Sequence, residues 1–134
     1  MNPARAGAIS SGAMITPAAV RATVERYVDR HTAGDIEGIL TCFAADARAE
    51  DPVGTDAHVG TEGLRAFFTG SHELCDRLEL VLTGPIRVAG NRAAFPMQAI
   101  SYIGDDVITV DIIDVMELGD DGLITDMKAY WGFE

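Results

Sequence analysis

The hydrophobic period of the sequence changes near residue 77, and this change restricts the possible folds more than any other feature. Before it, apolar residues recur every three or four positions, as in helices with one buried face. After it, strand-like runs with a period of two occupy about 77–83, 92–102, 107–118 and 123–131. Helices followed by a meander of strands predict an α+β domain, with one curved antiparallel sheet and helices on one face.

The first helix is expected to begin at Thr16 and Pro17, after a flexible N-terminal tail of residues 1–15. Threonine can accept a hydrogen bond from the start of a helix, and proline suits the first helical position. The apolar face of this helix consists of Val20, Val24, Tyr27 and Val28. Residues 16–134 are expected to form a single domain.

Two further helices are expected before the period changes. Gly34 ends the first helix, Asp35 can cap the second, and Thr61 can cap the third. The apolar positions expected to face inward are Ile36, Ile39, Leu40 and Phe43 in the second helix, and Leu64, Phe67 and Phe68 in the third.

Composition limits the possible partners. Ten Lys and Arg against 21 Asp and Glu give a formal net charge of −11, which repels nucleic-acid phosphates and anionic membrane surfaces. The sequence contains no secretory signal pattern and no run of membrane-spanning length, so we expect a cytoplasmic protein. Its three His and two Cys show no metal-binding spacing, so no metal site is expected.

Two adjacent acids precede a proline at residues 50–52, and only the second lies on an apolar face. In an extended segment Ala47, Ala49 and Asp51 share one side, while Glu50 lies on the other. Pro52 keeps Asp51 extended. Asp51 is therefore a candidate functional acid, although an Asp-Pro pair is also a common start of an ordinary turn.

A second acid interrupts an apolar strand face. In "VITVDIIDVMEL", residues 107–118, the even positions hold five apolar residues and Asp114, whereas Asp111 belongs to a more mixed face. Ionising a lone buried carboxyl group is costly, so Asp114 is expected to stay protonated or to find a partner. A pairing with an arginine or a backbone amide is the alternative to a functional role.

Tyr27 completes a set of three polar groups that are expected to face the interior. Its hydroxyl group lies on the inward stripe of the first helix and needs a partner there, which is also true of an ordinary core tyrosine. One ionisable carboxylate beside a neutral carboxyl group and a phenol would provide a proton-transfer base and two hydrogen-bond donors.

The strand faces that carry these acids are rich in Met, Phe and Trp, which would suit a flat hydrocarbon ligand. The alternative is that these side chains simply fill the core. The candidate substrate-binding residues are Phe43, Phe67, Phe68, Phe95, Met97, Ala99, Met116, Met127 and Trp131. Apolar residues on the opposite sheet face, including Ile113 and Tyr130, predict a homodimer.

With these residues in place, the chain resembles bacterial Δ5-3-ketosteroid isomerases, which belong to the NTF2-like, SnoaL-like superfamily. The most specific match is "EDPVG" at 50–54 combined with "DIIDVM" at 111–116, whereas "GDIEGI" at 34–39 and "FAADA" at 43–47 are common to many relatives of this fold. The other matching stretches are "RY" at 26–27, "LTGP" at 82–85 and "AYW" at 129–131. Together they extend from about residue 16 to the end of the chain.

The resemblance implies a cone-shaped fold with three N-terminal helices on the concave face of the sheet. It implies a steroid substrate, no cofactor, and proton transfer from C4 to C6 through a dienolate. Asp51 would be the base, and Tyr27 and protonated Asp114 would bind the dienolate oxygen, as is known for that family. Phe43 and Phe68 replace tyrosines that support the oxyanion tyrosine in some members.

Two other functions are compatible with these sequence features. One is another enzyme of the same fold, such as a polyketide-cyclase-like or dehydratase-like protein. The other is a non-catalytic steroid or lipid carrier that keeps the cavity but has no use for a base and two donors.

Overall fold

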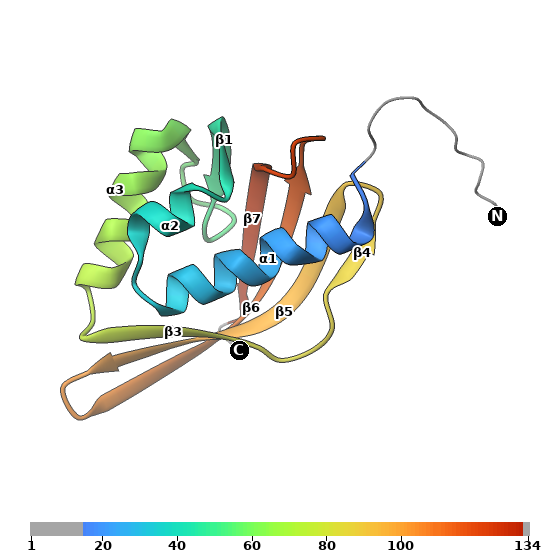
Figure 1. Cartoon of the computed structure of the whole chain (residues 1–134). Helices are drawn as coiled ribbons and strands as arrows, with labels where there is room; N and C mark the ends of the chain where they lie inside the picture. The colour runs from blue at the N-terminus through green and yellow to red at the C-terminus, as the bar shows by residue number, and fades with distance from the viewer. Residues whose placement is uncertain (1–14, 133–134) are drawn as a thin grey trace.

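The computed structural model describes residues 15–132, and most of the predicted N-terminal tail lies outside this range (Figure 1). The helices are α1 (Pro17–Thr32), α2 (Ile36–Leu40) and α3 (Gly60–Glu73). The strands are β1 (Phe43–Glu50), β2 (His58–Val59), β3 (Arg77–Leu82), β4 (Arg87–Ala89), β5 (Arg92–Ile103), β6 (Asp106–Leu118) and β7 (Ile124–Gly132).

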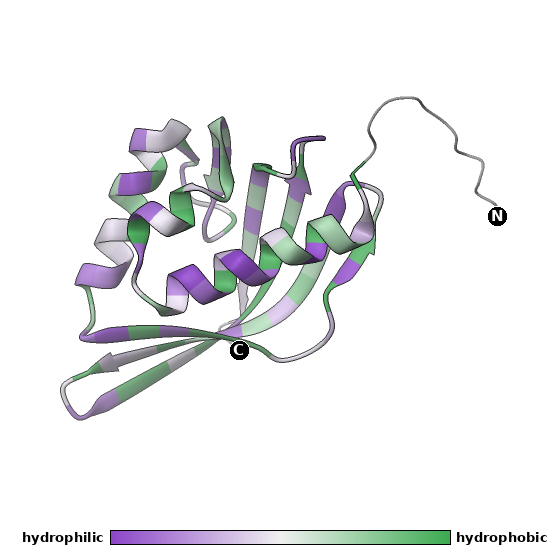
Figure 2. Ribbon diagram, viewed as in Figure 1, coloured by the Kyte–Doolittle hydropathy of each residue, from purple (hydrophilic) through white to green (hydrophobic). Residues whose placement is uncertain are grey.

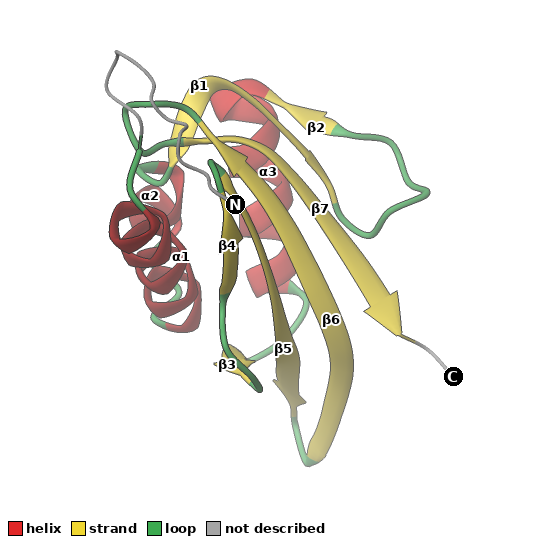
Figure 3. Ribbon diagram, turned by 90° about the vertical axis from the view of Figure 1, so that its right-hand side faces the viewer, coloured by secondary structure: helices red, strands yellow, loops and turns green. Residues whose placement is uncertain are grey.

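One sheet organises the described part of the chain, with the strand order β2-β1-β7-β6-β5-β3 and β4 paired to β5. Strands β1 and β7 run parallel, while the other pairs are antiparallel. Figures 1 and 3 show the three helices on one face of the sheet and the long strands curving around them. The predicted α+β fold is therefore confirmed.

The first helix begins as predicted. Thr16 is its N-cap, and the Thr16 hydroxyl oxygen accepts a hydrogen bond of 3.1 Å from the Ala19 backbone N–H. One face of α1 is buried against β3, β4 and β5. The Thr32 hydroxyl fixes the end of this helix to β3, because it contacts both the N–H and the C=O of Leu80.

The shorter helices differ from the predictions in two details. Asp35 caps α2 as expected and accepts a hydrogen bond of 3.0 Å from the Gly38 N–H, but α2 ends before Phe43, which begins β1. The predicted Thr61 cap of α3 is wrong. That helix already begins at Gly60, because Gly60 with φ of 76° makes the sharp turn out of β2.

Alternation along the strands places the core between the helices and the sheet. In β6 the buried positions are Ile112, Asp114, Met116 and Leu118. Figure 2 shows hydrophobic and hydrophilic residues alternating along the strands. Within residues 15–132, the helices are all too short or too polar to cross a membrane.

Candidate active site

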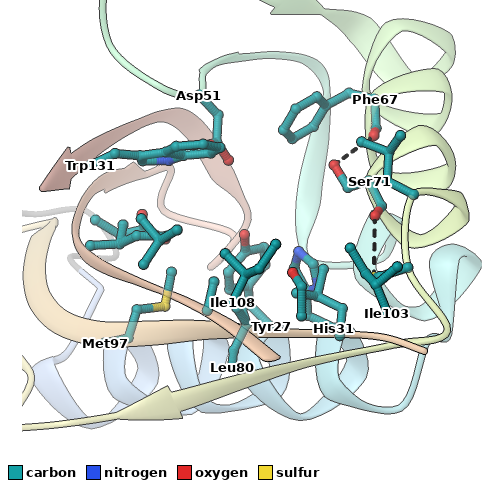
Figure 4. A pocket seen from close by; sticks show the side chains of 18 residues that line it. Tyr27, His31, Asp51, Phe67, Ser71, Leu80, Met97, Ile103, Ile108 and Trp131 are labelled. Carbon is teal, nitrogen blue, oxygen red and sulfur yellow. Dashed lines mark hydrogen bonds between the residues drawn. The ribbon is translucent and has the colours of Figure 1, made fainter. Parts of the chain in front are cut away.

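A cavity of about 280 Å³ lies between α1, α3 and the inner face of the sheet (Figure 4). In Figure 4, Asp51 and Trp131 lie at one end, Ile103 and Ser71 at the other, and Tyr27 between them. The remaining residues that line it are His31, Phe67, Leu74, Cys75, Leu78, Leu80, Met97, Ala99, Ser101, Ile108, Val110, Ile112 and Asp114. The wall is therefore mostly apolar, with a few polar groups in defined places.

Asp51 follows directly after β1 and is held by β7. The parallel pairing of these strands ends at Glu50, and the Val53 N–H then donates a 2.8 Å hydrogen bond to the Ala129 C=O. The Trp131 indole N–H donates a 2.8 Å hydrogen bond to an Asp51 carboxylate oxygen. Burial raises the pKa of Asp51 to about 6, although the bond from Trp131 opposes this rise. Asp51 is therefore ionised near neutral pH and is basic enough to accept a proton.

Asp114 is completely buried in the middle of β6. In the strand register it lies between Phe95 of β5 and Ala129 of β7. Neither of its carboxyl oxygens has a hydrogen-bond partner within residues 15–132. Burial raises its pKa well above the ordinary value, and the charge of Asp51 raises it further. Burial therefore favours the neutral carboxylic acid form of Asp114, which can donate a hydrogen bond.

Tyr27 reaches the same cavity from α1 and is 1% exposed. Its pKa is raised well above 10, by burial first and then by the charges of Asp114 and Asp51, so the phenol keeps its proton. Tyr27, Asp51 and Asp114 all line the same cavity. The rings of Phe43 and Phe68 pack edge-on against Tyr27, with centroid distances of 5.9 and 6.2 Å.

The structure separates the predicted substrate-binding residues into two groups. Four of them line the cavity, namely Phe67, Met97, Ala99 and Trp131. The other five are not among its lining residues: Phe43, Phe68, Phe95, Met116 and Met127. The physical reason is packing. The phenylalanines of β1 and α3 pack around Tyr27, and the two methionines face each other in the β6–β7 register, beyond Asp114.

Sequence reasoning missed His31, which lines the cavity one helical turn after Tyr27. Its Nδ1 lies 3.0 Å from the Nε2 of His72 on α3. A signal was present in the sequence, because His31 continues the inward stripe of Val20, Val24 and Tyr27. The sequence spacing of the two histidines gave no reason to pair them, since they meet only through helix packing.

These groups together can perform proton transfer. The ionisable Asp51 carboxylate can accept a proton from a molecule in the cavity. The neutral forms of Asp114 and Tyr27 can donate hydrogen bonds to an oxygen of that molecule that becomes negatively charged. Within residues 15–132, no group of three or more His, Cys, Asp or Glu side chains is arranged to hold a metal ion.

Several known proteins are similar to this chain. The chain is 35% identical to the steroid Delta-isomerase of Nocardioides simplex over 114 residues, which cover 85% of this chain and 90% of that protein. It is 31% identical to the epoxide hydrolase LasB of Streptomyces lasalocidi over 119 residues. That match covers 79% of this chain but spans only 39% of LasB.

Among solved structures, the epoxide hydrolase/cyclase-like enzyme SalBIII, described in pyran ring formation in the polyether salinomycin, has the same fold. Its TM-score is 0.77 at 24% sequence identity, over 85% of this chain and 91% of that one. Residues 24–127 match the SnoaL-like domain family. The fold, the family match and the similarity to the isomerase agree, and the chain belongs to the SnoaL-like family within the NTF2-like superfamily.

Proposed function

We propose that this protein is a steroid Δ-isomerase that converts Δ5-3-ketosteroids to conjugated Δ4-3-ketosteroids. The observation that carries the proposal is the pairing of one ionisable and one neutral carboxyl group, Asp51 and Asp114, in one apolar cavity with the Tyr27 phenol. The 35% identity to the Nocardioides simplex steroid Delta-isomerase supports it. A rigid hydrocarbon substrate also suits the apolar wall.

In the proposed reaction the Asp51 carboxylate removes a proton from C4 of the steroid. The electrons of that C–H bond move into the ring, and the C3 carbonyl oxygen becomes the negatively charged oxygen of a dienolate. Protonated Asp51 then returns the proton to C6, which moves the double bond into conjugation. The proton and the electrons remain within the enzyme and its substrate, so the proposed reaction requires no cofactor.

Tyr27 and Asp114 have the protonation states that this charge movement requires. Burial favours the protonated form of both groups, so both can donate hydrogen bonds to the dienolate oxygen. Neither carboxyl oxygen of Asp114 has a hydrogen-bond partner within residues 15–132, so Asp114 has no existing bond to break first. Preorganised donors in a water-poor site are commonly the largest catalytic term, each worth about 3–4 kcal/mol.

The proposal is tested by incubating the protein with a 5-ene-3-ketosteroid and following the ultraviolet absorbance of the conjugated enone. A rise above the buffer rate that disappears in Asp51→Asn supports isomerisation by this base. Steroid binding without any rise would instead identify a carrier. Trp131 is the single tryptophan of the sequence and lines the cavity, so its fluorescence reports steroid binding independently of turnover.

A second candidate function is the opening of an epoxide. The same two carboxyl groups support it, because neutral Asp114 can protonate an epoxide oxygen while ionised Asp51 activates the attacking hydroxyl group or water. The sequence identity with the epoxide hydrolase LasB also supports epoxide opening. Turnover of an epoxide substrate, with no absorbance change on the ketosteroid, would favour epoxide opening over isomerisation.

A further inference from the structure

Two histidines join helices α1 and α3 at the wall of the cavity. His31 Nδ1 lies 3.0 Å from His72 Nε2, and the ring centroids are 4.8 Å apart. His31 is only 6% exposed, whereas His72 is half-buried. A buried polar group is expected to have its hydrogen bonds satisfied, so a histidine in this apolar wall requires an explanation.

His31 lies beside the group that we propose to bind the substrate oxygen. Its ring centroid is 5.5 Å from that of Tyr27, and the two rings are almost perpendicular at 83°. Figure 4 shows both side chains reaching into the cavity from neighbouring turns of α1. The bond to His72 uses Nδ1, and within residues 15–132 no hydrogen bond of His31 Nε2 is found. This nitrogen is therefore available to a bound molecule.

The pairing with His72 can fix which His31 nitrogen carries the proton. Burial, and then the proximity of His72, lower the pKa of His31 to about 4, so its ring is neutral at pH 7 and has a single N–H. When His72 Nε2–H donates to His31 Nδ1, the proton of His31 must be on Nε2. The opposite arrangement would make Nε2 an acceptor. A negative oxygen in the cavity favours the first arrangement, because it needs donors.

The two phenylalanine rings that pack against Tyr27 provide no such donor. Phe43 and Phe68 contact the Tyr27 ring edge-on, and His31 itself packs against Phe68 with a centroid distance of 5.4 Å. The imidazole of His31 is therefore the polar member of an otherwise apolar ring cluster.

We propose that His31 is a third catalytic hydrogen-bond donor. In this arrangement its Nε2–H contacts the substrate oxygen that Tyr27 and Asp114 also bind, and His72 is a positioning residue that fixes the His31 tautomer. The inference rests on the proposed isomerase function. It also implies that the substrate atom beside His31 is an uncharged oxygen that gains negative charge during the reaction.

Four variants test the inference on the purified full-length chain. His31→Phe keeps an aromatic ring but removes both nitrogens, and we expect kcat to fall about 10- to 100-fold with little change in KM, because the donor acts on developing charge. His31→Gln keeps a donor and is expected to lose less. His72→Phe removes the bond that fixes the proton of His31 on one nitrogen, so its kcat should lie between those of the wild type and His31→Phe. His58→Phe is the matched control, since His58 stacks on Phe67 outside the cavity lining, and it should retain the wild-type rate.

A spectroscopic measurement separates the donor from a purely structural link between the helices. The probe is a steroid with a phenolic A ring, whose ionised oxygen stands in for the dienolate oxygen. With ¹⁵N-labelled histidine in the wild-type chain, we expect His31 to be protonated at Nε2 when the probe is bound, with its N–H proton shifted downfield. His31→Phe should also bind the ionised probe at least about 10-fold more weakly.

The possible outcomes are distinct. Equal kcat in wild type and His31→Phe, or a bound complex in which His31 is protonated at Nδ1, would overturn the inference. If His31→Phe does not fold, the wild-type tautomer measurement still decides. If the wild type fails to isomerise the ketosteroid but His31 Nε2–H contacts the phenolic probe, the proposed function fails while the donor assignment stands.

Discussion

Replacing Asp51 with asparagine should make the protein inactive and more stable at the same time. The amide cannot accept a proton from the substrate, so turnover should be lost. It can still accept the hydrogen bond from the Trp131 indole N–H, so the geometry of the site should remain. Replacing a residue that serves only the fold would lower stability. Loss of activity together with a gain in stability therefore indicates a functional residue.

The size of the stability gain follows from the pKa of Asp51. Burial raises this pKa from 3.8 to about 6, so the folded state holds the proton more tightly than the unfolded state does. Stability therefore decreases as pH rises between these two values and stays lower by a constant amount above them. The difference between the two pKa values corresponds to about 3 kcal/mol in the free energy of unfolding. Because Asp51 is only partly buried, we expect Asp51→Asn to be more stable than the wild type by about 1–3 kcal/mol at pH 8.

Urea unfolding at pH 8, compared with the same measurement at pH 3, provides the assay. The difference between the variant and the wild type should be present at pH 8 and nearly absent at pH 3, where Asp51 is protonated in both states. Fluorescence titration with a steroid should show that binding persists. A variant that is less stable than the wild type at pH 8, or that keeps a near-native rate, would refute the assignment of Asp51 as a buried base.

Other substitutions give independent tests. Trp131→Phe removes the bond that lowers the Asp51 pKa, so the acidic midpoint of kcat/KM should move above 6; an unmoved midpoint would show that this bond does not tune the base. Asp114→Asn should lose less activity than Asp114→Leu, for which we expect a loss of about 10²–10³ in kcat, and equal losses would contradict the role of a neutral donor. Thr16→Ala should lower the free energy of unfolding by about 1 kcal/mol in urea, and no change would mean that the cap is unimportant. Because Ile113 and Tyr130 are 51% and 48% exposed on the outer sheet face, sedimentation at micromolar concentration should show a dimer, and a monomer alone would exclude it.

The features that could be predicted from the sequence are those set by local patterns. The Thr16 cap, the Asp35 cap and the four long strands follow from capping chemistry and hydrophobic period, and the structure has them. Alternation of apolar residues also favoured Asp114 over Asp111 as the acid that faces inward. In the structure Asp114 is fully buried and Asp111 is exposed. Strand parity assigns the face of a residue without knowledge of the neighbouring strands, so this inference needed no tertiary information.

The features that could not be predicted depend on which elements meet. The short strands β2 and β4 carry too few residues to show a period, so only pairing with β1 and β5 defines them. Phe95 and Met97 share a strand face, but only Met97 lines the cavity, because its position along the strand decides between core and pocket. The contact of His31 with His72 requires α1 to pack against α3, and their 41-residue separation in sequence hides it.

The parallel pairing of β1 with β7 has a consequence for synthesis. The base at the end of β1 and the indole that bonds to it at the end of β7 are separated by 80 residues, and the last strand of the described fold contributes that indole. A nascent chain still held by the ribosome at β7 therefore has its helices and most of its sheet but lacks a finished catalytic pocket. If the proposed function is right, enzymatic activity would emerge only after β7 has been synthesised, so it would report the arrival of that strand.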